Sequence, residues 1–212
     1  MIDEEYLMST ATLFYVHDPM CSWCWGHRPQ WEHLQAALPD SISVNNVVGG
    51  LAPDSNEVMP LAQQQAISSY WKKIEAMLGT QFNHSFWQQN VPRRATYPAC
   101  RAVIAARWQN AEEKMIIAIQ EAYYLQAKNP SDTETLLLVA AELGLDAEKF
   151  SKDLFSEKLE KVFMQELRLA HSLPINGFPS MVLQYHEQVH VIPLDYKDYR
   201  GAIKVITEII CE

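Results

Sequence analysis

The stretch Ala11-Thr-Leu-Phe-Tyr-Val-His-Asp-Pro-Met-Cys-Ser-Trp-Cys-Trp25 decides the fold. Its first six residues are apolar and rich in β-formers, and His17 to Met20 then bring the chain to a turn. From Trp25 to Leu38 apolar residues recur at helical spacing, which places Cys21 and Cys24 in the first turn of a helix. We therefore predict a strand that runs directly into a helix N-terminus, with both cysteines at the junction.

Two cysteines at such a junction suit redox chemistry. Three positions apart on a helix, they face the same way, with Cα atoms roughly 5 to 6 Å apart, which allows a disulfide to close. Free backbone amides and the positive end of the helix dipole stabilise a thiolate on Cys21, so we expect Cys21 to attack and Cys24 to resolve. This chemistry requires that the pair is not buried away from solvent and that no metal holds it.

Zinc binding and ordinary core packing are the alternative interpretations of this motif. Structural zinc needs four ligands, and the remaining cysteines, Cys100 and Cys211, have neither a second Cys-x-x-Cys nor a close Cys/His pair beside them. We therefore predict no metal site. Met20, Trp23 and Trp25 are candidates for a hydrophobic rim that binds substrate around the reactive thiol, although core packing would explain them equally well.

A second motif lies far along the chain, where Asn176-Gly-Phe-Pro-Ser180 precedes a strand-like run. Together with Asp18-Pro-Met-Cys-Ser-Trp-Cys-Trp-Gly26 and Pro29, it makes the chain resemble the DsbA superfamily of thioredoxin-fold proteins. Within that superfamily the chain is most similar to the FrnE-type and predicted cytoplasmic disulfide-isomerase branch. The resemblance implies that Pro179 is a cis-proline packed opposite the disulfide, and that the Phe178 backbone hydrogen-bonds an extended substrate as an added strand.

The sequence departs from DsbA at two positions near the cysteines. Trp23 stands where DsbA has a histidine, and Tyr15 stands where DsbA buries an acidic residue. We therefore predict that the pKa of Cys21 lies between about 3.5, the value for DsbA, and about 8.5, that of a free thiol, with a less oxidising disulfide. His17 and Asp18 are the nearest ionisable groups in sequence and are candidate modulators of the thiols.

Length, composition and charge narrow the class of protein. The 212 residues, 48% of them hydrophobic, can form one thioredoxin-like domain, residues 1–58 and 173–212, interrupted by a helical insertion, residues 59–172. The net charge of -9 disfavours nucleic acid and anionic membranes as partners. Residues 1–6 lack the basic and apolar regions of a secretion signal, and no stretch reads as a membrane span, so we expect a cytoplasmic protein whose cysteines rest largely as the dithiol.

The predicted elements follow the order of an α/β thioredoxin-like fold, a mixed sheet flanked by helices, that carries a DsbA-type helical insertion. The run from 42 to 50 predicts a second strand parallel to the first, and strands return at 181–185 and 189–193 before a closing helix at 197–210. The helices predicted within the insertion are 59–78, 98–109, 112–127, 131–143, one capped by Asp146, and 156–172. Ser131-Asp-Thr-Glu134 is interpreted as a capping box.

The cysteine at position 100 is open to two interpretations. Cys100 follows Pro98 near a helix start and is either an extra redox or substrate-contacting thiol or a small buried residue between Ala99 and Ala102. The second interpretation is favoured because a free cysteine behaves as a small hydrophobe.

These inferences predict a thiol-disulfide oxidoreductase that acts on protein or peptide disulfides as a reductase or isomerase. No bound cofactor is expected, and glutathione or a thioredoxin-type reductant would reopen the Cys21–Cys24 disulfide. Two alternatives stay open. Kappa-class glutathione transferases and hydroxychromene-carboxylate isomerases share the scaffold but place a serine where this chain has Cys21, and a non-enzymatic adaptor would hold a client protein without disulfide cycling.

Overall fold

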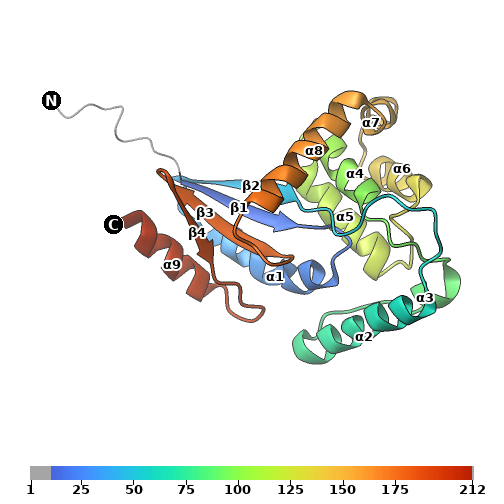
Figure 1. The fold of residues 1–212 in the computed structure, drawn as a ribbon, viewed down its shortest axis with the longest axis horizontal. Coiled ribbons are helices and arrows are strands. Elements are labelled where there is room, and N and C mark those ends of the chain that lie inside the picture. Colours follow the sequence, from blue (N-terminus) through green and yellow to red (C-terminus); the bar gives the residue numbers. More distant parts are fainter. Residues whose placement is uncertain (1–10, 212) are drawn as a thin grey trace.

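A four-stranded mixed sheet lies at the centre of the protein in the computed structural model, which describes residues 11–211 (Figure 1). Residues 1–10, which include the segment considered for a secretion signal, and Glu212 lie outside the described residues. The strands are β1 (Ala11–His17), β2 (Ile42–Val48), β3 (Ser180–Tyr185) and β4 (Gln188–Ile192), in the spatial order β2-β1-β3-β4. β1 pairs in parallel with β2 and antiparallel with β3, and β4 is antiparallel to β3.

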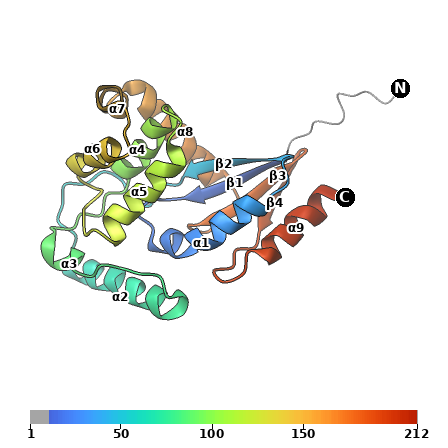
Figure 2. The same ribbon diagram turned by 180° about the vertical axis from the view of Figure 1, so that it is seen from behind.

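Helices cover both faces of this sheet, which explains why β1 is apolar on both sides. On one face, α1 (Ser22–Ala37) and α9 (Arg200–Cys211) pack against alternate β1 residues such as Leu13 and Tyr15 (Figure 2). On the other face, Ala170 of α8 (Glu157–Ser172) packs against Phe14 and Val16. The C-terminal end of β1 thus leads the chain from the middle of the sheet into the first turn of α1.

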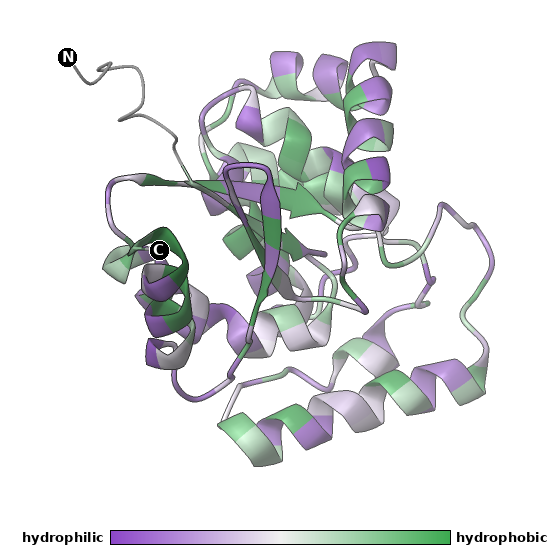
Figure 3. Ribbon diagram, turned by 60° about the vertical axis from the view of Figure 1, so that its left-hand side comes forward, coloured by the Kyte–Doolittle hydropathy of each residue, from purple (hydrophilic) through white to green (hydrophobic). Residues whose placement is uncertain are grey.

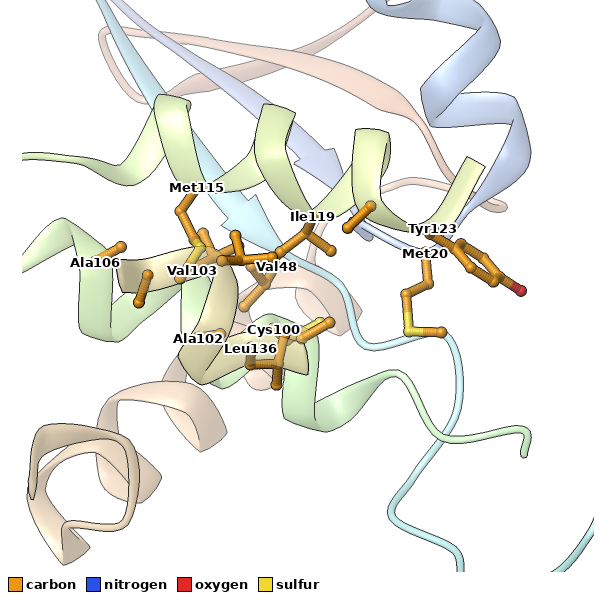
Figure 4. Close-up of a cluster of buried hydrophobic side chains, with 14 of the residues drawn as sticks. Met20, Val48, Cys100, Ala102, Val103, Ala106, Met115, Ile119, Tyr123 and Leu136 are labelled. Atoms are coloured by element: carbon orange, nitrogen blue, oxygen red, sulfur yellow. The ribbon is translucent and has the colours of Figure 1, made fainter. Parts of the chain in front are cut away.

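A second hydrophobic core forms among the helices between β2 and β3. These helices are α2 (Leu61–Leu78), α3 (Phe86–Gln89), α4 (Tyr97–Arg107), α5 (Glu112–Tyr124), α6 (Thr133–Glu142), α7 (Ala147–Leu154) and α8. Hydrophobic and hydrophilic residues are interspersed along the helices (Figure 3), and in α4 every residue from Ala102 to Ala106 is buried. Met20 and Val48 from the sheet side join the same cluster (Figure 4). No helix of the described residues is both long and apolar enough to span a bilayer.

The order of elements predicted from the sequence is confirmed, and the predicted Asp146 cap accepts a hydrogen bond from the backbone amide of Lys149. Ser156, predicted as the first residue of a helix, is instead the N-cap of α8 and accepts from the Leu159 amide. The capping box at residue 131 is wrong. Asp132 occupies the N-cap of α6 without a side-chain capping bond, and the Ser131 hydroxyl donates instead to the carbonyl of Ala95 at 2.7 Å. The short helix α3 was not predicted, and the division into a sheet domain and an insertion stays a prediction.

Candidate active site

The two cysteines lie at the start of α1, as the sequence predicts. Cys21 is the N-cap residue and Cys24 is in the first turn. The Cys21 amide donates to the Asp18 carbonyl at 3.0 Å, which holds the chain in a turn between β1 and the helix. Both thiols are free, and the Cys24 thiol is close enough to hydrogen-bond the Cys21 sulfur. The pair is therefore in the dithiol form, with the two sulfurs facing each other across one helical turn.

Their surroundings shift the two thiols in opposite directions. The pKa of Cys21 is lowered, first by the hydrogen bond from the Cys24 thiol and then by the backbone amides of Cys24 and Trp23, against burial and the negative charge of Asp18. The pKa of Cys24 is raised well above its ordinary value because it is buried and lies beside Cys21. This asymmetry favours ionisation of Cys21 before Cys24, and the Cys24 thiol lowers the pKa of Cys21 more than the backbone amides do.

The pair is more enclosed than a reactive thiol would suggest. Cys21 exposes only 6% of its surface and Cys24 only 1%. The Cys21 thiol also lies 3.5 Å from the Phe178 carbonyl oxygen, to which it can donate. In this dithiol form both thiols are buried, contrary to the requirement that the pair be open to solvent, and Cys24 is the more deeply enclosed of the two.

The proline loop lies beside Cys21, far from it in sequence. The peptide bond between Phe178 and Pro179 is cis, and the Phe178 carbonyl faces the thiol. The Phe178 ring packs against Gly49 so closely that a Cβ at Gly49 would lie 2.1 Å from the ring. The glycine after β2 is therefore required for the loop to sit against the cysteines.

Asp18 is fully buried and joins three segments next to the cysteines. Its carboxylate accepts hydrogen bonds from the Met20 amide at 2.8 Å, the Leu51 amide at 2.7 Å and the Thr96 hydroxyl at 2.6 Å. The Cys100 thiol approaches the same carboxylate at 3.6 Å. Burial raises the pKa of Asp18, although the hydrogen bonds from Leu51, Thr96 and Met20 oppose that shift.

His17 is equally buried, but neither of its ring nitrogens has a hydrogen-bond partner among the described residues. Burial and the charge of Arg107 lower the pKa of His17 to about 3, so the imidazole is neutral near pH 7. Its ring stacks on Tyr15 with centroids 5.7 Å apart. The histidine is therefore placed near the cysteines, as predicted, but as an uncharged group.

The three other apolar candidates differ in their surroundings. Met20 is 6% exposed and lies in the core cluster of the helices, and it does not form part of an exposed rim (Figure 4). The indole of Trp25 donates to the Gln81 carbonyl at 3.0 Å and stacks on Tyr124. Trp23 is half-buried and contacts Tyr196 edge to face. Met20 is therefore a core residue, whereas Trp23, Trp25 and Phe178 are all half-buried apolar groups.

Cys100 is completely buried in α4, and burial and the nearby Asp18 raise its pKa well above the ordinary value. This environment agrees with the favoured interpretation of a small core residue. Sequence reasoning overlooked a second buried pair near Cys24, in which Tyr15 hydrogen-bonds His27 Nδ1 at 3.2 Å. A shared helical face between Cys24, His27 and Trp31 was the available indication. Among residues 11–211, no group of three potential metal-ligating side chains lies together.

Comparison with known protein families agrees with this geometry. The family model described as Thioredoxin matches residues 14–200. Among curated relatives, the ClpXP adapter protein SpxH of Bacillus subtilis is 24% identical over 185 residues, which are 84% of this chain and 61% of that protein. SpxH of Bacillus cereus strain ATCC 10987 is 28% identical over 181 residues, which are 84% of this chain and 60% of that protein. The chain thus spans about three fifths of the length of these relatives.

Solved structures share the same fold. A proposed protein disulfide isomerase from Nitrosomonas europaea has a TM-score of 0.83 at 23% identity, covering 95% of this chain and 98% of that one. The cytosolic disulfide reductase DsbM from Pseudomonas aeruginosa has a TM-score of 0.77 at 24% identity, covering 95% and 100%. DsbA from the same organism has a TM-score of 0.60 at 14% identity, covering 94% and 81%. The DsbA-like thioredoxin fold inferred from the sequence is confirmed.

Proposed function

This chain belongs to the thioredoxin family, and from that premise we propose that it is a thiol-disulfide oxidoreductase that acts on protein or peptide disulfides. The observation that carries the proposal is the pair of free thiols at the start of α1. The local environment favours ionisation of Cys21 and disfavours that of Cys24. An attacking thiolate and a protonated resolving thiol are what a two-step exchange needs.

The reaction follows from these two states. The Cys21 thiolate attacks one sulfur of a substrate disulfide, forming a mixed disulfide and releasing the other substrate sulfur as a thiolate. Cys24 then loses its proton and attacks the Cys21 sulfur, so that the second substrate thiolate leaves and the Cys21–Cys24 disulfide forms. The substrate gains two electrons, and an external thiol must return them to the cysteines.

The partly exposed groups beside Cys21 give the substrate its contacts. Trp23 and the Phe178–Pro179 loop flank the sulfur, and we assign the Phe178 backbone the role of pairing with an extended substrate segment. Because Cys21 is 6% exposed, attack requires its hydrogen bond to Phe178 to break first. Brief alkylation of the native protein with iodoacetamide should label Cys21 before the buried Cys24 and Cys100. Equal labelling of the three thiols would contradict this order.

The direction of electron flow that we favour is reduction in the cytoplasm. The similar structure from Pseudomonas aeruginosa is a cytosolic disulfide reductase, and it has also been determined with GSH. We therefore take glutathione or a thioredoxin-type protein as the external reductant. Oxidised protein incubated with reduced glutathione at cytosolic concentration should recover two thiols, counted by mass after alkylation. Recovery only with a thioredoxin system would instead select the protein reductant.

Trapping tests the proposal directly. Replacing Cys24 with alanine leaves the mixed disulfide unresolved, so protein partners should accumulate on Cys21 in cells and be released by dithiothreitol. The matched control carries Cys21→Ser in addition to Cys24→Ala and should trap nothing. Equal recovery of partners by the two variants would overturn the proposal.

A second function is favoured by the relatives named ClpXP adapter protein SpxH. An adaptor of this kind would bind a client and deliver it to a protease without using the cysteines. A variant with Cys21→Ser and Cys24→Ser separates the two functions. If client turnover by the protease depends on this protein and survives the double substitution, the adaptor function holds. If turnover does not depend on this protein and disulfide exchange is lost, the oxidoreductase function holds.

A further inference from the structure

A small cavity lies behind the resolving cysteine, between the sheet and helix α5. Four elements line it: β1 with Tyr15 and His17, α1 with Cys24, Arg28, Trp31 and Glu32, β2 with Asn46, and α5 with Glu113, Ile116, Ile117 and Gln120. Tyr15 and His17 are two residues apart on one strand, and Asn46 is the parallel partner of Tyr15, so their side chains lie on the same face of the sheet. The strands β1 and β2 therefore line one side of the cavity, and α5 lines the opposite side.

The cavity is polar where it meets the cysteine. His17, Asn46 and Gln120 are each more than nine-tenths buried, and each has an atom without a hydrogen-bond partner among the described residues. These atoms are both ring nitrogens of His17, Oδ1 of Asn46 and Oε1 of Gln120. A buried polar atom without a partner costs free energy, so four such atoms from three side chains around one space indicate a polar occupant.

The size of the cavity identifies that occupant. The space open to the centre of a water molecule is about 20 Å³. One ordered water requires roughly 10 to 15 Å³ and two to four polar partners, and the three side chains supply that number. The tyrosine hydroxyl in the same wall is already bonded to His27, so it does not compete for the water.

Charged groups lie toward the outer side of the cavity. Arg28 forms a salt bridge with Glu32 at 2.7 Å, and the exposed Glu113 accepts a hydrogen bond from Gln35. A water between Cys24 and these groups would connect a buried thiol to solvent. Cys24 needs such a connection, because its pKa is raised and it exposes only 1% of its surface.

Resting on the proposed oxidoreductase function, we propose that this cavity is the proton exit of Cys24, in which His17, Asn46 and Gln120 hold the water that takes up the thiol proton. The step concerned is the resolution of the mixed disulfide. As the Cys24 sulfur bonds to the Cys21 sulfur, its proton passes to the water, and a proton of that water passes on to solvent near Glu32 and Glu113. The Cys21 bond to the substrate breaks, and the substrate leaves as a thiolate.

His17 acts in this step as a positioning residue. A neutral imidazole has one N–H donor and one acceptor nitrogen, so it can orient a water without holding a charge. The titratable and charged groups that face it are Tyr15 and Asp18 on its own segment, Cys24, Arg28 and Glu32 on α1, Arg107 on α4 and Glu113 on α5. Because Gln120 and Glu113 belong to α5, the helical segment completes the chemistry of the resolving thiol.

Stopped-flow release of thionitrobenzoate from 5,5′-dithiobis(2-nitrobenzoate) tests the inference in a Cys211→Ser background, which removes the exposed third thiol and serves as the wild type here, because the two steps then release one chromophore each. Attack by Cys21 gives the first phase and attack by Cys24 the second. Gln120→Leu should leave the first phase within about twofold of wild type and slow the second at least about tenfold, because it removes the Oε1 acceptor that helps to hold the water. Gln126→Leu, an exposed substitution just beyond the end of α5, is the matched control and should change neither phase.

A second, conservative variant keeps the inference testable if Gln120→Leu does not fold. Gln120→Glu keeps the shape and places a titratable carboxyl in the cavity, so the second phase should recover and its pH profile should differ from that of wild type. A folded Gln120→Leu protein with a second phase within twofold of wild type overturns the inference alone. If that variant does not fold, a wild-type pH profile in Gln120→Glu overturns it. A wild-type protein that shows no first phase overturns the proposed function and this inference together.

Discussion

His17 and Asp18 are consecutive, almost completely buried and adjacent to the same cysteines, yet their surroundings are opposite. The Asp18 carboxylate accepts three hydrogen bonds. The donors are the Met20 amide in the same turn, the Leu51 amide in the loop after β2 and the hydroxyl of Thr96, which precedes α4. The His17 ring faces a cavity, and both its nitrogens lack a partner among the described residues. One residue is fully engaged by protein groups, and the other is left free to interact with something else.

This difference assigns Asp18 to the stability of the site and leaves His17 available for the reaction. A buried carboxylate is tolerated when its lone pairs are used, and its removal leaves several donors unpaired. A buried imidazole whose nitrogens have no protein partner leaves them available to a polar group such as a water. The pKa shifts have opposite consequences for stability. The raised pKa of Asp18 makes its contribution fall as pH rises, whereas the lowered pKa of His17 makes its contribution fall as pH falls.

The largest effect is expected at Asp18. Asp18→Leu leaves the Met20 and Leu51 amides and the Thr96 hydroxyl buried without an acceptor, which should lower the free energy of unfolding by about 4 kcal/mol. Urea denaturation at pH 7 measures the loss. If the variant were as stable as wild type, Asp18 would not join the three segments, and the contrast with His17 would disappear.

His17 should govern stability in acid. Its folded-state pKa is about 3 against an ordinary value of 6.5, so the unfolded chain takes up a proton over this range and the folded chain does not. Wild type should therefore lose about 2 to 3 kcal/mol of stability between pH 6.5 and pH 4.5 from this residue. His17→Phe should show a flatter profile in urea denaturation at the two pH values.

The exposed His171, changed in the same way, serves as the control for that profile. His171→Phe should keep the wild-type loss of stability in acid, since its side chain is solvated in the folded protein. An unchanged acid profile in His17→Phe would show that the buried imidazole is protonated in the folded state.

Thr96 tests the same junction with a smaller change. Thr96→Val keeps the shape but removes the hydroxyl that donates to Asp18 and accepts from the Ala52 amide at 3.1 Å, which should cost about 2 kcal/mol. Thr96→Ser keeps both hydrogen bonds and should cost less than half as much. Equal losses in thermal or urea denaturation would show that the two hydrogen bonds of the hydroxyl do not account for the effect of Thr96→Val.

The sequence predicted the secondary structure around the cysteines, but it did not predict the different surroundings of His17 and Asp18. The strand, the turn and the helix with its two cysteines follow from local periodicity, and the order of elements follows from their succession. The partners of Asp18 could not be predicted, because Leu51 and Thr96 are brought to it by the path of the chain between β2 and α4. The capping box at Ser131 failed for the same reason, since the hydroxyl meets a carbonyl 36 positions away in sequence.

Substitution of Cys100 is expected to give the smallest effect. It tests whether the hydrogen-bonded group around Asp18 takes part in disulfide exchange. Cys100→Ala removes a buried sulfur that approaches Asp18 at 3.6 Å, a long and weak contact, so the loss of stability should be about 1 kcal/mol. Both phases of disulfide exchange should stay within about twofold of wild type, because the thiol is completely buried and its raised pKa keeps it protonated. A Cys100→Ser variant retains a donor to Asp18 and separates the hydrogen bond from the volume of the sulfur. If Cys100→Ala slowed exchange tenfold while Cys100→Ser did not, the hydrogen bond from residue 100 to Asp18 would influence the reactivity of Cys21 and Cys24. Asp18 and its hydrogen-bond partners would then take part in the reaction as well as in stability.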